Sequence, residues 1–187
     1  MITATLPSSY WYLKGFDIVG ISNYMDWFNF MSYDIHGIWD SSSEWTNSVV
    51  NLHTNLTGAH SLALFGTFRN NINPAKVALG LGFYGRSFTL KDASCNTPGC
   101  AFANDIGLEG NTGRANPRTC TGTSNILSNY EIVRILNKSS PQVVYDATAG
   151  VNWTTWNDNQ WVLYDNAKTL LQKRDFANAQ CLSGTFA

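Results

Sequence analysis

The fold is decided by the stretch FNFMSYDIHGIW at residues 28–39. It begins with dense aromatic and apolar residues and ends in a polar segment that contains glycine, a pattern that predicts a β-strand followed by a loop. Side chains alternate between the two faces of a strand. One face is mainly apolar, fits a covering layer of helices, and carries Phe28, Phe30 and Ser32. The opposite face carries Asn29, Met31 and Tyr33.

Polar groups collect where this strand ends. Tyr33 brings a hydroxyl to the second face, Asp34 follows it directly, and Trp39 stands in the loop. A face that becomes polar at the carboxyl end of a strand is typical of an α/β barrel, whose active sites lie at that end. The stretch therefore predicts one wall of a site in a barrel-type α/β fold.

The residues before this strand predict a second, parallel strand. Residues 2–7 have the character of a short strand, and Pro7 ends it. We expect Asp17 to cap a helix between the two strands. The apolar residues of that helix recur at helical spacing and are Ile18, Ile21, Tyr24 and Met25. A strand–helix–strand unit within one sheet is parallel and has a right-handed crossover.

The next segment predicts a polar loop over residues 40–47, a helix over 57–72 and a strand over 76–88. In the strand over 76–88, small residues occupy one face. The other face fits a covering layer of helices and carries the large apolar residues Val77, Leu79, Leu81 and Phe83. The small residues leave space on the inner face, and Tyr84 and Arg86 stand beside that space at the carboxyl end. An arginine without a partner is costly inside a barrel, which favours a role for Arg86 at a site.

The barrel pattern ends at residue 89, where a segment rich in glycine, asparagine, threonine and cysteine begins. We expect a small α+β insertion over 89–160, so the chain divides into residues 1–88, 89–160 and 161–187. The elements expected after residue 89 are a helix over 127–136, a hairpin over 143–156, a helical stretch over 161–179 and the beginning of a strand over 181–187. Three tryptophans are expected in the core of this part: Trp153, Trp156 and Trp161.

Composition narrows the classes of partner. The chain has 187 residues, of which 13% are aromatic and 13% charged, and its formal net charge is −1. Such a low and balanced charge argues against nucleic acid and against a membrane surface as partners. No apolar run approaches the ~18 residues of a membrane-spanning helix. A surface rich in aromatic rings and poor in charge suits neutral polymers such as polysaccharides, because rings stack on sugar faces.

The cysteines indicate an oxidising compartment. Their even number and their spacing favour disulfides over a zinc site, and buried free thiols are the alternative. These four cysteines, which we expect to be disulfide-bonded, are Cys95, Cys100, Cys120 and Cys181. Three glycosylation sequons favour the same compartment and begin at Asn55, Asn137 and Asn152. His36 fits a turn residue, whereas His53 and His60 indicate no site.

Several motifs together resemble family 18 of the glycoside hydrolases, the chitinases. These motifs are TATLP at 3–7, Met-x-Tyr-Asp and His-Gly-x-Trp within 31–39, GFYGRSF at 82–88, QWVLYD at 160–165 and CLSGTFA at 181–187. The resemblance covers essentially the whole chain. Within the family, the motifs are most similar to those of large fungal chitinases that resemble yeast killer-toxin subunits. It implies strands five to eight of a (β/α)8 TIM barrel with a small α+β insertion after strand seven. That region is the C-terminal half of the family's catalytic domain.

The resemblance also implies roles for individual residues. In this family the sugar's own 2-acetamido oxygen attacks the anomeric carbon while a protein glutamate protonates the leaving oxygen, with retention of configuration. Tyr33 would hold the acetamido carbonyl, and Asp34 would accept a hydrogen bond from the substrate. The residues expected to bind sugar are Met31, Trp39, Tyr84, Arg86 and Glu131. Glu131 is expected either on a helix surface or as the partner of Arg86. Neither a metal nor a cofactor is implied.

One motif of the family is missing. The family's acid lies in Asp-x-x-Asp-x-Asp-x-Glu, and no such run contains Glu44, Glu109 or Glu131. We therefore expect a fragment of a chitinase, an enzyme that cleaves β-1,4-linked N-acetylglucosamine polymers, and we expect this fragment to be inactive by itself. The alternative is a catalytically inactive chitin-binding lectin or toxin-anchoring subunit of the same fold.

Three further expectations follow from the resemblance. Chitin or a chitooligosaccharide is the expected partner, and the expected location is extracellular or in the cell wall. Half a barrel would leave two open strand edges and an inner face without its partner layers. We therefore expect the isolated chain to be poorly soluble or molten.

Overall fold

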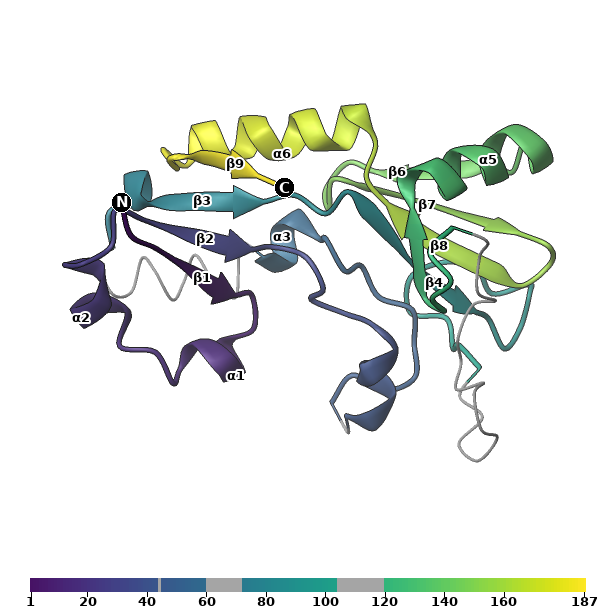
Figure 1. The fold of residues 1–187 in the computed structure, drawn as a ribbon. Helices are drawn as coiled ribbons and strands as arrows, with labels where there is room; N and C mark the ends of the chain where they lie inside the picture. The colour runs from purple at the N-terminus through teal and green to yellow at the C-terminus, as the bar shows by residue number, and fades with distance from the viewer. Residues whose placement is uncertain (44, 60–71, 104–119) are drawn as a thin grey trace.

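Two β-sheets lie side by side in the computed structural model, which describes residues 1–43, 45–59, 72–103 and 120–187 (Figure 1). The first sheet is parallel and has the strand order β1-β2-β3-β9. The second sheet is antiparallel and has the order β5-β4-β8-β7-β6. In the first sheet β3 pairs with β9, and in the second β4 pairs with β8. Each sheet therefore joins segments that are distant in the sequence.

The parallel sheet consists of short strands: β1 (Thr3–Pro7), β2 (Trp27–Met31), β3 (Val77–Gly80) and β9 (Gly184–Phe186). Phe28 and Phe30 on β2 are buried, whereas their neighbours along the strand are partly exposed. The alternation predicted for this strand is therefore confirmed. The strands predicted over 2–7 and 181–187 are also confirmed, as is the parallel pairing of β1 with β2.

The crossover between β1 and β2 contains two short helices, α1 (Tyr10–Leu13) and α2 (Ile18–Ser22). The Asp17 carboxylate accepts a hydrogen bond from the Gly20 amide at 2.9 Å, so the predicted helix cap is confirmed. Ile18 is buried and packs in the same core as Phe28. The long helix α6 (Ala167–Ala179) runs along the parallel sheet in Figure 1 and adds Ala177 to that core.

The strand predicted over 76–88 is in fact two strands in different sheets. The chain leaves the parallel sheet after Gly80 and enters the second sheet at Tyr84, where β4 (Tyr84–Thr89) begins. Phe83, predicted to face the helices, is 57% exposed. Close packing explains the glycine at position 80, because a Cβ there would lie 2.7 Å from the Phe30 carbonyl oxygen. The prediction was wrong because the alternation of large and small residues continues along the sequence past Gly80, where the chain passes from one sheet to the other.

The second sheet adds β5 (Ile126–Ser128), β6 (Val143–Asp146), β7 (Val151–Trp156) and β8 (Gln160–Tyr164) to β4. β6 and β7 form the predicted hairpin. The helix predicted over 161–179 is wrong in its first part, because residues 161–164 form the centre of the sheet and α6 begins at Ala167. The predicted divisions after residues 88 and 160 cut through β4 and β8, so both flanking parts contribute strands to this sheet.

The core of the second sheet is built largely from aromatic residues. Trp161 is fully buried and lies 5.9 Å from Phe88, measured between ring centroids. Trp153 and Trp156 are buried as well, which confirms the prediction that these three tryptophans belong to the core. Trp156 packs below α5 (Asn129–Ser139) in a second apolar cluster with Ile132. The sheet therefore has an apolar cluster on each side.

The helices differ in part from the predictions. α5 begins later than predicted because residues 126–128 pair with β4, and Ser128 is its cap. Of the helix predicted over 57–72, the structure describes α3 (Leu56–Ala59), and residues 60–71 lie outside the described part. Asn55 caps α3, because its side-chain oxygen accepts hydrogen bonds from the amides of Thr57 and Gly58. No helix within the described ranges has the length and apolar character needed to cross a membrane.

The cysteines form one disulfide, between Cys95 and Cys100, whose Cα atoms are 5.6 Å apart. Cys120 and Cys181 are exposed free thiols. The expectation that all four cysteines are paired is therefore wrong for this structure. The spacing of cysteines in a sequence cannot show whether two of them reach disulfide distance in the fold, and here only the near pair does.

One buried ion pair fixes the start of α6. Lys173 Nζ lies 2.6 Å from both carboxylate oxygens of Asp165, and the Thr169 hydroxyl donates to one of them at 2.8 Å. Both charged side chains are almost completely buried. A buried charge that loses its partner is strongly destabilising.

We predict that Lys173→Met lowers the free energy of unfolding by about 3–5 kcal/mol, because it leaves the Asp165 carboxylate buried and unpaired. Urea denaturation measures the loss. The matched control is Arg174→Met, which removes an exposed ion pair with Asp175 one position along the same helix and should cost no more than about 1 kcal/mol. Equal losses for the two variants would contradict the structural role of the buried pair.

Candidate functional site

The site is centred on the carboxylate of Asp34, which follows β2 at the carboxyl end of the parallel sheet. Its backbone has a φ of 55°, in the left-handed region, which turns the chain sharply after the strand. Oδ1 accepts hydrogen bonds from the Tyr84 hydroxyl at 2.6 Å and from Arg86 Nε at 2.9 Å. Oδ2 lies 2.7 Å from Arg86 Nη2. The carboxylate therefore binds the guanidinium through both oxygens.

Tyr84 and Arg86 reach Asp34 because they share one face of β4. They alternate with residues that pack into the sheet, as the burial pattern of the strand shows. The chain passes from β3 to β4 within a few residues, so β4 begins near the carboxyl ends of the parallel strands. The site therefore lies where the two sheets meet. Asp34, Tyr84 and Arg86, which were predicted to belong to one site, are in direct contact there.

Charge and hydrogen bonding hold Asp34 in its ionised form. Burial alone would raise the pKa of this carboxyl. The close approach of His53, the hydrogen bonds from Arg86 and Tyr84, and the positive charge of Arg86 together outweigh burial and lower the pKa well below its ordinary value. The opposite holds for Tyr84, whose pKa is raised by burial and by the bond to Asp34. The site thus combines a fixed anion with a phenol that keeps its proton.

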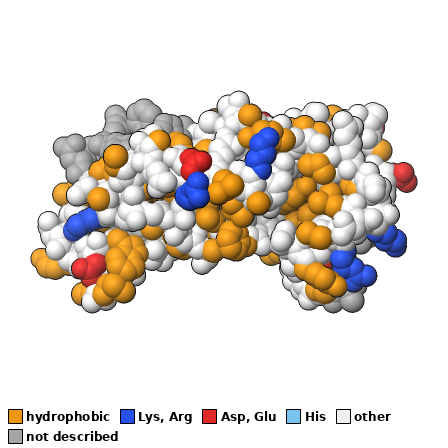
Figure 2. All heavy atoms as spheres, turned by 90° about the horizontal axis from the view of Figure 1, so that it is seen from above, with side chains coloured by type: hydrophobic (Ala, Val, Ile, Leu, Met, Phe, Trp, Pro, Cys, Tyr) orange, Lys and Arg blue, Asp and Glu red, His pale blue; other side chains and the backbone are white. Residues whose placement is uncertain are grey.

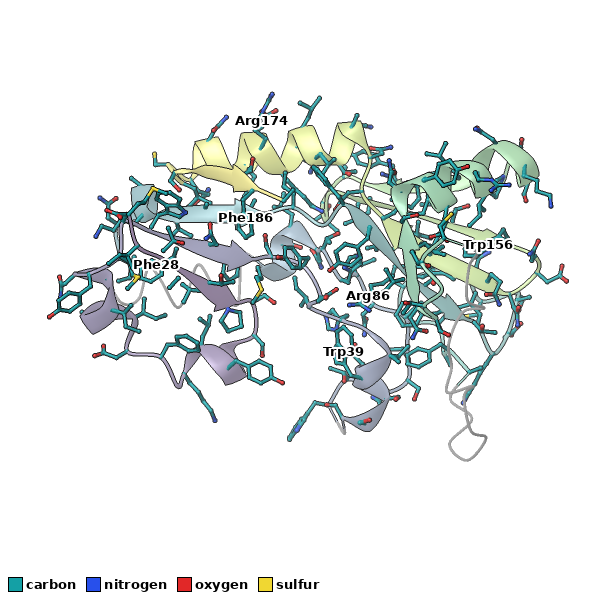
Figure 3. The ribbon with its side chains drawn as sticks, in the orientation of Figure 1. Phe28, Trp39, Arg86, Trp156, Arg174 and Phe186 are labelled. Atoms are coloured by element: carbon teal, nitrogen blue, oxygen red, sulfur yellow. A yellow bond between two sulfur atoms is a disulfide. The ribbon has the colours of Figure 1, made fainter. Side chains whose placement is uncertain are left out.

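Trp39 adds an aromatic surface to the same group. It belongs to η1 (Ile38–Ser42), a short helical turn in the loop after Asp34. The guanidinium carbon of Arg86 lies 4.9 Å from the centroid of the Trp39 ring, a cation–π distance. Figure 3 shows the two side chains close together between the sheets. Because Trp39 is still 44% exposed, part of the indole is accessible to a ligand.

Tyr33 stands beside these groups, next to two glycines. A Cβ at Gly80 would lie 2.8 Å from the Tyr33 ring, and one at Gly82 would lie 3.4 Å from Tyr33 Cβ. The small residues therefore make room for this tyrosine. Its ring meets that of Tyr84 edge to face at 6.2 Å between centroids. Burial and the nearby charge of Asp34 raise the pKa of Tyr33, so its hydroxyl is a donor at neutral pH.

The two remaining predicted residues are less closely tied to this group. Met31 is partly exposed at the end of β2. Glu131 is buried, and its carboxylate accepts hydrogen bonds from the amides of Cys120, Thr121 and Ser128 at 2.9–3.1 Å. Neither place expected for Glu131, on a helix surface or beside Arg86, is what the structure has, because Arg86 pairs with Asp34 and the buried Glu131 completes the capping box of α5. The spacing Ser128-x-x-Glu131 was the sequence signal for that cap.

His53 is the residue of the site that the sequence did not reveal. It is fully buried, and its Nδ1 lies 3.6 Å from Asp34 Oδ1. Its ring is tilted by 33° against that of Tyr84, with 5.3 Å between the centroids. His36, in contrast, pairs with Asp40 at 2.9 Å within the loop that carries Trp39. A single histidine in an irregular segment has no periodicity or spacing that could assign it to a site.

A cavity of about 370 Å³ lies on the other side of Tyr84, between α5 and α6. Its lining is mainly apolar and includes Phe83, Val133 and Leu170, but none of Asp34, Arg86 and Trp39. Figure 2, seen from the side of α6, shows apolar side chains on the surface of this part of the molecule. Within the described ranges, no group of three or more His, Cys, Asp or Glu side chains could hold a metal ion.

Comparisons with known proteins agree on one family. The family model described as "Glycosyl hydrolases family 18" matches residues 1–187. The protein called "Secreted chitinase LysM12" from Penicillium expansum is 32% identical over 98% of this chain and 12% of its own length. "Killer toxin subunits alpha/beta" of Kluyveromyces lactis is 36% identical over 72% of this chain and 11% of its own length.

Solved structures have the same fold. The class V chitinase of Nicotiana tobaccum superimposes with a TM-score of 0.79 at 21% identity, over 100% of this chain and 51% of that protein. The Ostrinia furnacalis Group IV chitinase in complex with allosamidin gives a TM-score of 0.81 at 25% identity, over 98% of this chain and 48% of that protein. The chain thus spans about half the length of these structures and a much smaller share of the fungal relatives. The fold is of the TIM-barrel type.

The lowered pKa of Asp34 predicts a pH-dependent contribution to stability. Because the pKa is lower in the folded than in the unfolded state, the contribution is complete above the unfolded value of about 4 and is lost as the pH falls further. The difference in unfolding free energy between the native protein and Asp34→Asn should be constant between about pH 7 and pH 5 and shrink below about pH 4. Urea titrations at several pH values measure it.

The matched control is Asp175→Asn, which changes an exposed carboxylate of α6 and should have a small effect at every pH. A difference between native protein and Asp34→Asn that is the same at pH 7 and at about pH 3 would contradict an ionised, hydrogen-bonded Asp34.

Proposed function

Because the chain belongs to family 18 of the glycosyl hydrolases, we propose that it forms the chitin-binding face and part of the catalytic centre of a chitinase. One observation carries the proposal. Two tyrosine hydroxyls, an ionised carboxylate, a guanidinium and an indole converge where the two sheets meet; these belong to Tyr33, Tyr84, Asp34, Arg86 and Trp39. A neutral sugar polymer needs this combination of hydrogen-bonding groups and an aromatic surface.

The proposed reaction uses the substrate's own acetamido group as nucleophile. Its carbonyl oxygen attacks the anomeric carbon, and the oxygen of the leaving sugar takes a proton from an acid. Tyr33 donates its hydroxyl to the acetamido carbonyl and holds the oxygen in line for attack. Asp34 accepts a hydrogen bond from the acetamido N–H or from a sugar hydroxyl. The raised pKa of Tyr33 and the lowered pKa of Asp34 support a donor and an acceptor in these roles.

The proposed sugar contacts extend on both sides of this point. Trp39 stacks on a sugar beyond the cleaved bond, through the part of the indole that Arg86 leaves accessible. Tyr84 and Arg86 bind sugars on the non-reducing side, and Met31 shapes the floor. Arg86 can do so while neutralised by Asp34, since a guanidinium has more donors than the carboxylate uses. Sugar binding by Glu131 stays a prediction, because the oxygens of the Glu131 carboxylate already accept hydrogen bonds from three backbone amides.

The acid is proposed to come from the other half of a barrel. Four parallel strands, with a second sheet inserted between β3 and β9, support the assignment to strands five to eight with an insertion after strand seven. The solved relatives are about twice as long, and the 187 residues contain no Asp-x-x-Asp-x-Asp-x-Glu. The whole protein would then cleave β-1,4-linked N-acetylglucosamine polymers outside the cell or in the cell wall. The name of the Penicillium relative and the disulfide support that location.

We predict that the chain binds tetra-N-acetylchitotetraose and that Trp39→Ala weakens binding roughly tenfold or more, because the mutation removes the apolar surface on which a sugar stacks. Isothermal titration calorimetry measures the affinity. Trp45→Ala is the matched control: Trp45 lies in the same loop at 91% exposure, and its loss should leave affinity within about twofold. Cellotetraose, which lacks acetamido groups, should bind more weakly.

The same samples test the assignment of the acid. We expect residues 1–187 to release no chromophore from a chitobiose glycoside, since the loss of a general acid typically costs ~10²–10⁴-fold. A longer form that supplies the acid motif should be active, and Tyr33→Phe should lower its kcat. Turnover by residues 1–187 that Asp34→Ala abolishes would place the acid here instead. Equal affinity for both tetrasaccharides, or equal effects of Trp39→Ala and Trp45→Ala, would contradict the proposed site.

A further inference from the structure

The imidazole of His53 is a buried polar group that the proposed chemistry does not use. The side chain is fully buried, and neither Nδ1 nor Nε2 makes a hydrogen bond within the described ranges. Burying a polar group without a partner is costly, so such groups are rare in folded proteins and are retained where they have a task. Its Nδ1 lies 3.6 Å from Oδ1 of Asp34, the carboxylate at the centre of the site.

The backbone fixes His53 beside the loop that carries the site. The Ile35 amide donates to the His53 carbonyl at 3.1 Å, directly after Asp34 in the chain. The ring lies against that of Tyr84 at 5.3 Å between centroids. On another side Gly82 comes close enough that a Cβ there would lie 3.7 Å from His53 Cε1. Neighbours on these sides therefore restrict the ring to an orientation in which Nδ1 faces Asp34.

The chemistry of the two groups decides which ring nitrogen carries the proton. An ionised carboxylate only accepts hydrogen bonds, so a lone pair on Nδ1 would repel Oδ1, whereas Nδ1–H can donate to it. At 3.6 Å the two atoms are beyond ordinary hydrogen-bond distance. A small movement of the carboxylate would close that gap. Hydrogen bonds around catalytic groups are often long without ligand and shorten when substrate binds.

We propose that His53 is a positioning residue for Asp34, whose neutral imidazole donates Nδ1–H to Oδ1 and holds the carboxylate in place when a chitooligosaccharide binds. The inference rests on the proposed function for its ligand. Tyr84 and Arg86 approach the carboxylate from β4, and His53 approaches it from the segment before α3. A carboxylate held from two elements keeps its direction when a sugar competes for one of its oxygens.

The surrounding charges agree with a neutral ring. Burial is the largest influence and lowers the pKa of His53, and Asp34, Asp165 and Arg86 are the charged groups that act on it. The charge of Asp165 is neutralised by Lys173, which lies 2.6 Å from both of its oxygens. A charged imidazole would also bury a second N–H at Nε2, for which the described structure holds no acceptor.

A pair of variants of similar size tests the donor itself. Asn can place an amide N–H where Nδ1 stands, whereas Leu fills the same space without a donor. We expect His53→Leu to weaken the binding of tetra-N-acetylchitotetraose roughly tenfold, and His53→Asn to recover most of that loss. Calorimetry measures both affinities, and circular dichroism verifies that both variants are folded. Equal affinity in the two variants would overturn the proposal, because a merely space-filling role does not distinguish Leu from Asn.

A second measurement needs neither ligand nor variant. Long-range ¹H–¹⁵N spectra of the native protein report which nitrogen of His53 is protonated. We expect the neutral Nδ1–H tautomer throughout the range from about pH 5 to pH 8. The Nε2–H tautomer would overturn the proposal even if the variants failed to fold. If the proposed function were wrong, the result would be different. The native protein would then not bind the tetrasaccharide in calorimetry, whereas the spectra would still show the Nδ1–H tautomer that the contact with Asp34 requires.

Discussion

The ion pair between Asp34 and Arg86 is the interaction on which the site depends. Asp34 follows β2 of the parallel sheet, and Arg86 belongs to β4 of the antiparallel sheet. The Arg86 side chain is only 12% exposed, so its charge would be costly without a partner. The pair therefore holds the two sheets together at their junction. Tyr84, Trp39 and His53 are all placed by contact with one of its two members.

Covalent connectivity brings the two charges together. The chain leaves the parallel sheet at Gly80 and has entered the antiparallel sheet by Tyr84, so Arg86 cannot lie far from the end of β2. The glycines of this connection allow close packing, because a Cβ at position 80 would collide with the Phe30 carbonyl and with the Tyr33 ring. Substitutions at Gly80 would therefore change the site through Tyr33 as well as the sheet.

Local signals in the sequence predicted the parts of the fold that depend on local interactions. The alternation around Phe30, the Asp17 cap and the hairpin of β6 and β7 all appear in the structure. Non-local pairing could not be predicted in the same way. Nothing in residues 160–164 indicates that this segment lies between β4 and β7, and the helical stretch predicted over 161–179 includes most of it. The prediction of a single strand over 76–88 was wrong for the same reason.

The site was predictable to the extent that its residues stand in motifs. Asp34, Tyr84 and Arg86 were expected together, and they form the ion pair and the hydrogen bonds at its centre. Glu131 was expected on a helix surface or beside Arg86, but in the capping box of α5 its carboxylate accepts hydrogen bonds from backbone amides. His53 carries no sequence pattern, because its relation to Asp34 arises only from packing. Motifs identify residues that are constrained by chemistry, whereas residues that join a site through packing can be identified only from the folded structure.

The most direct measurement is the crystal structure of the protein with tetra-N-acetylchitotetraose bound. We expect one sugar with its acetamido group against Tyr33 and Asp34, and another stacked on Trp39, with the ion pair between Asp34 and Arg86 retained. A tetrasaccharide in the apolar cavity between α5 and α6, with no sugar within hydrogen-bond distance of Asp34 or Tyr33, would contradict it.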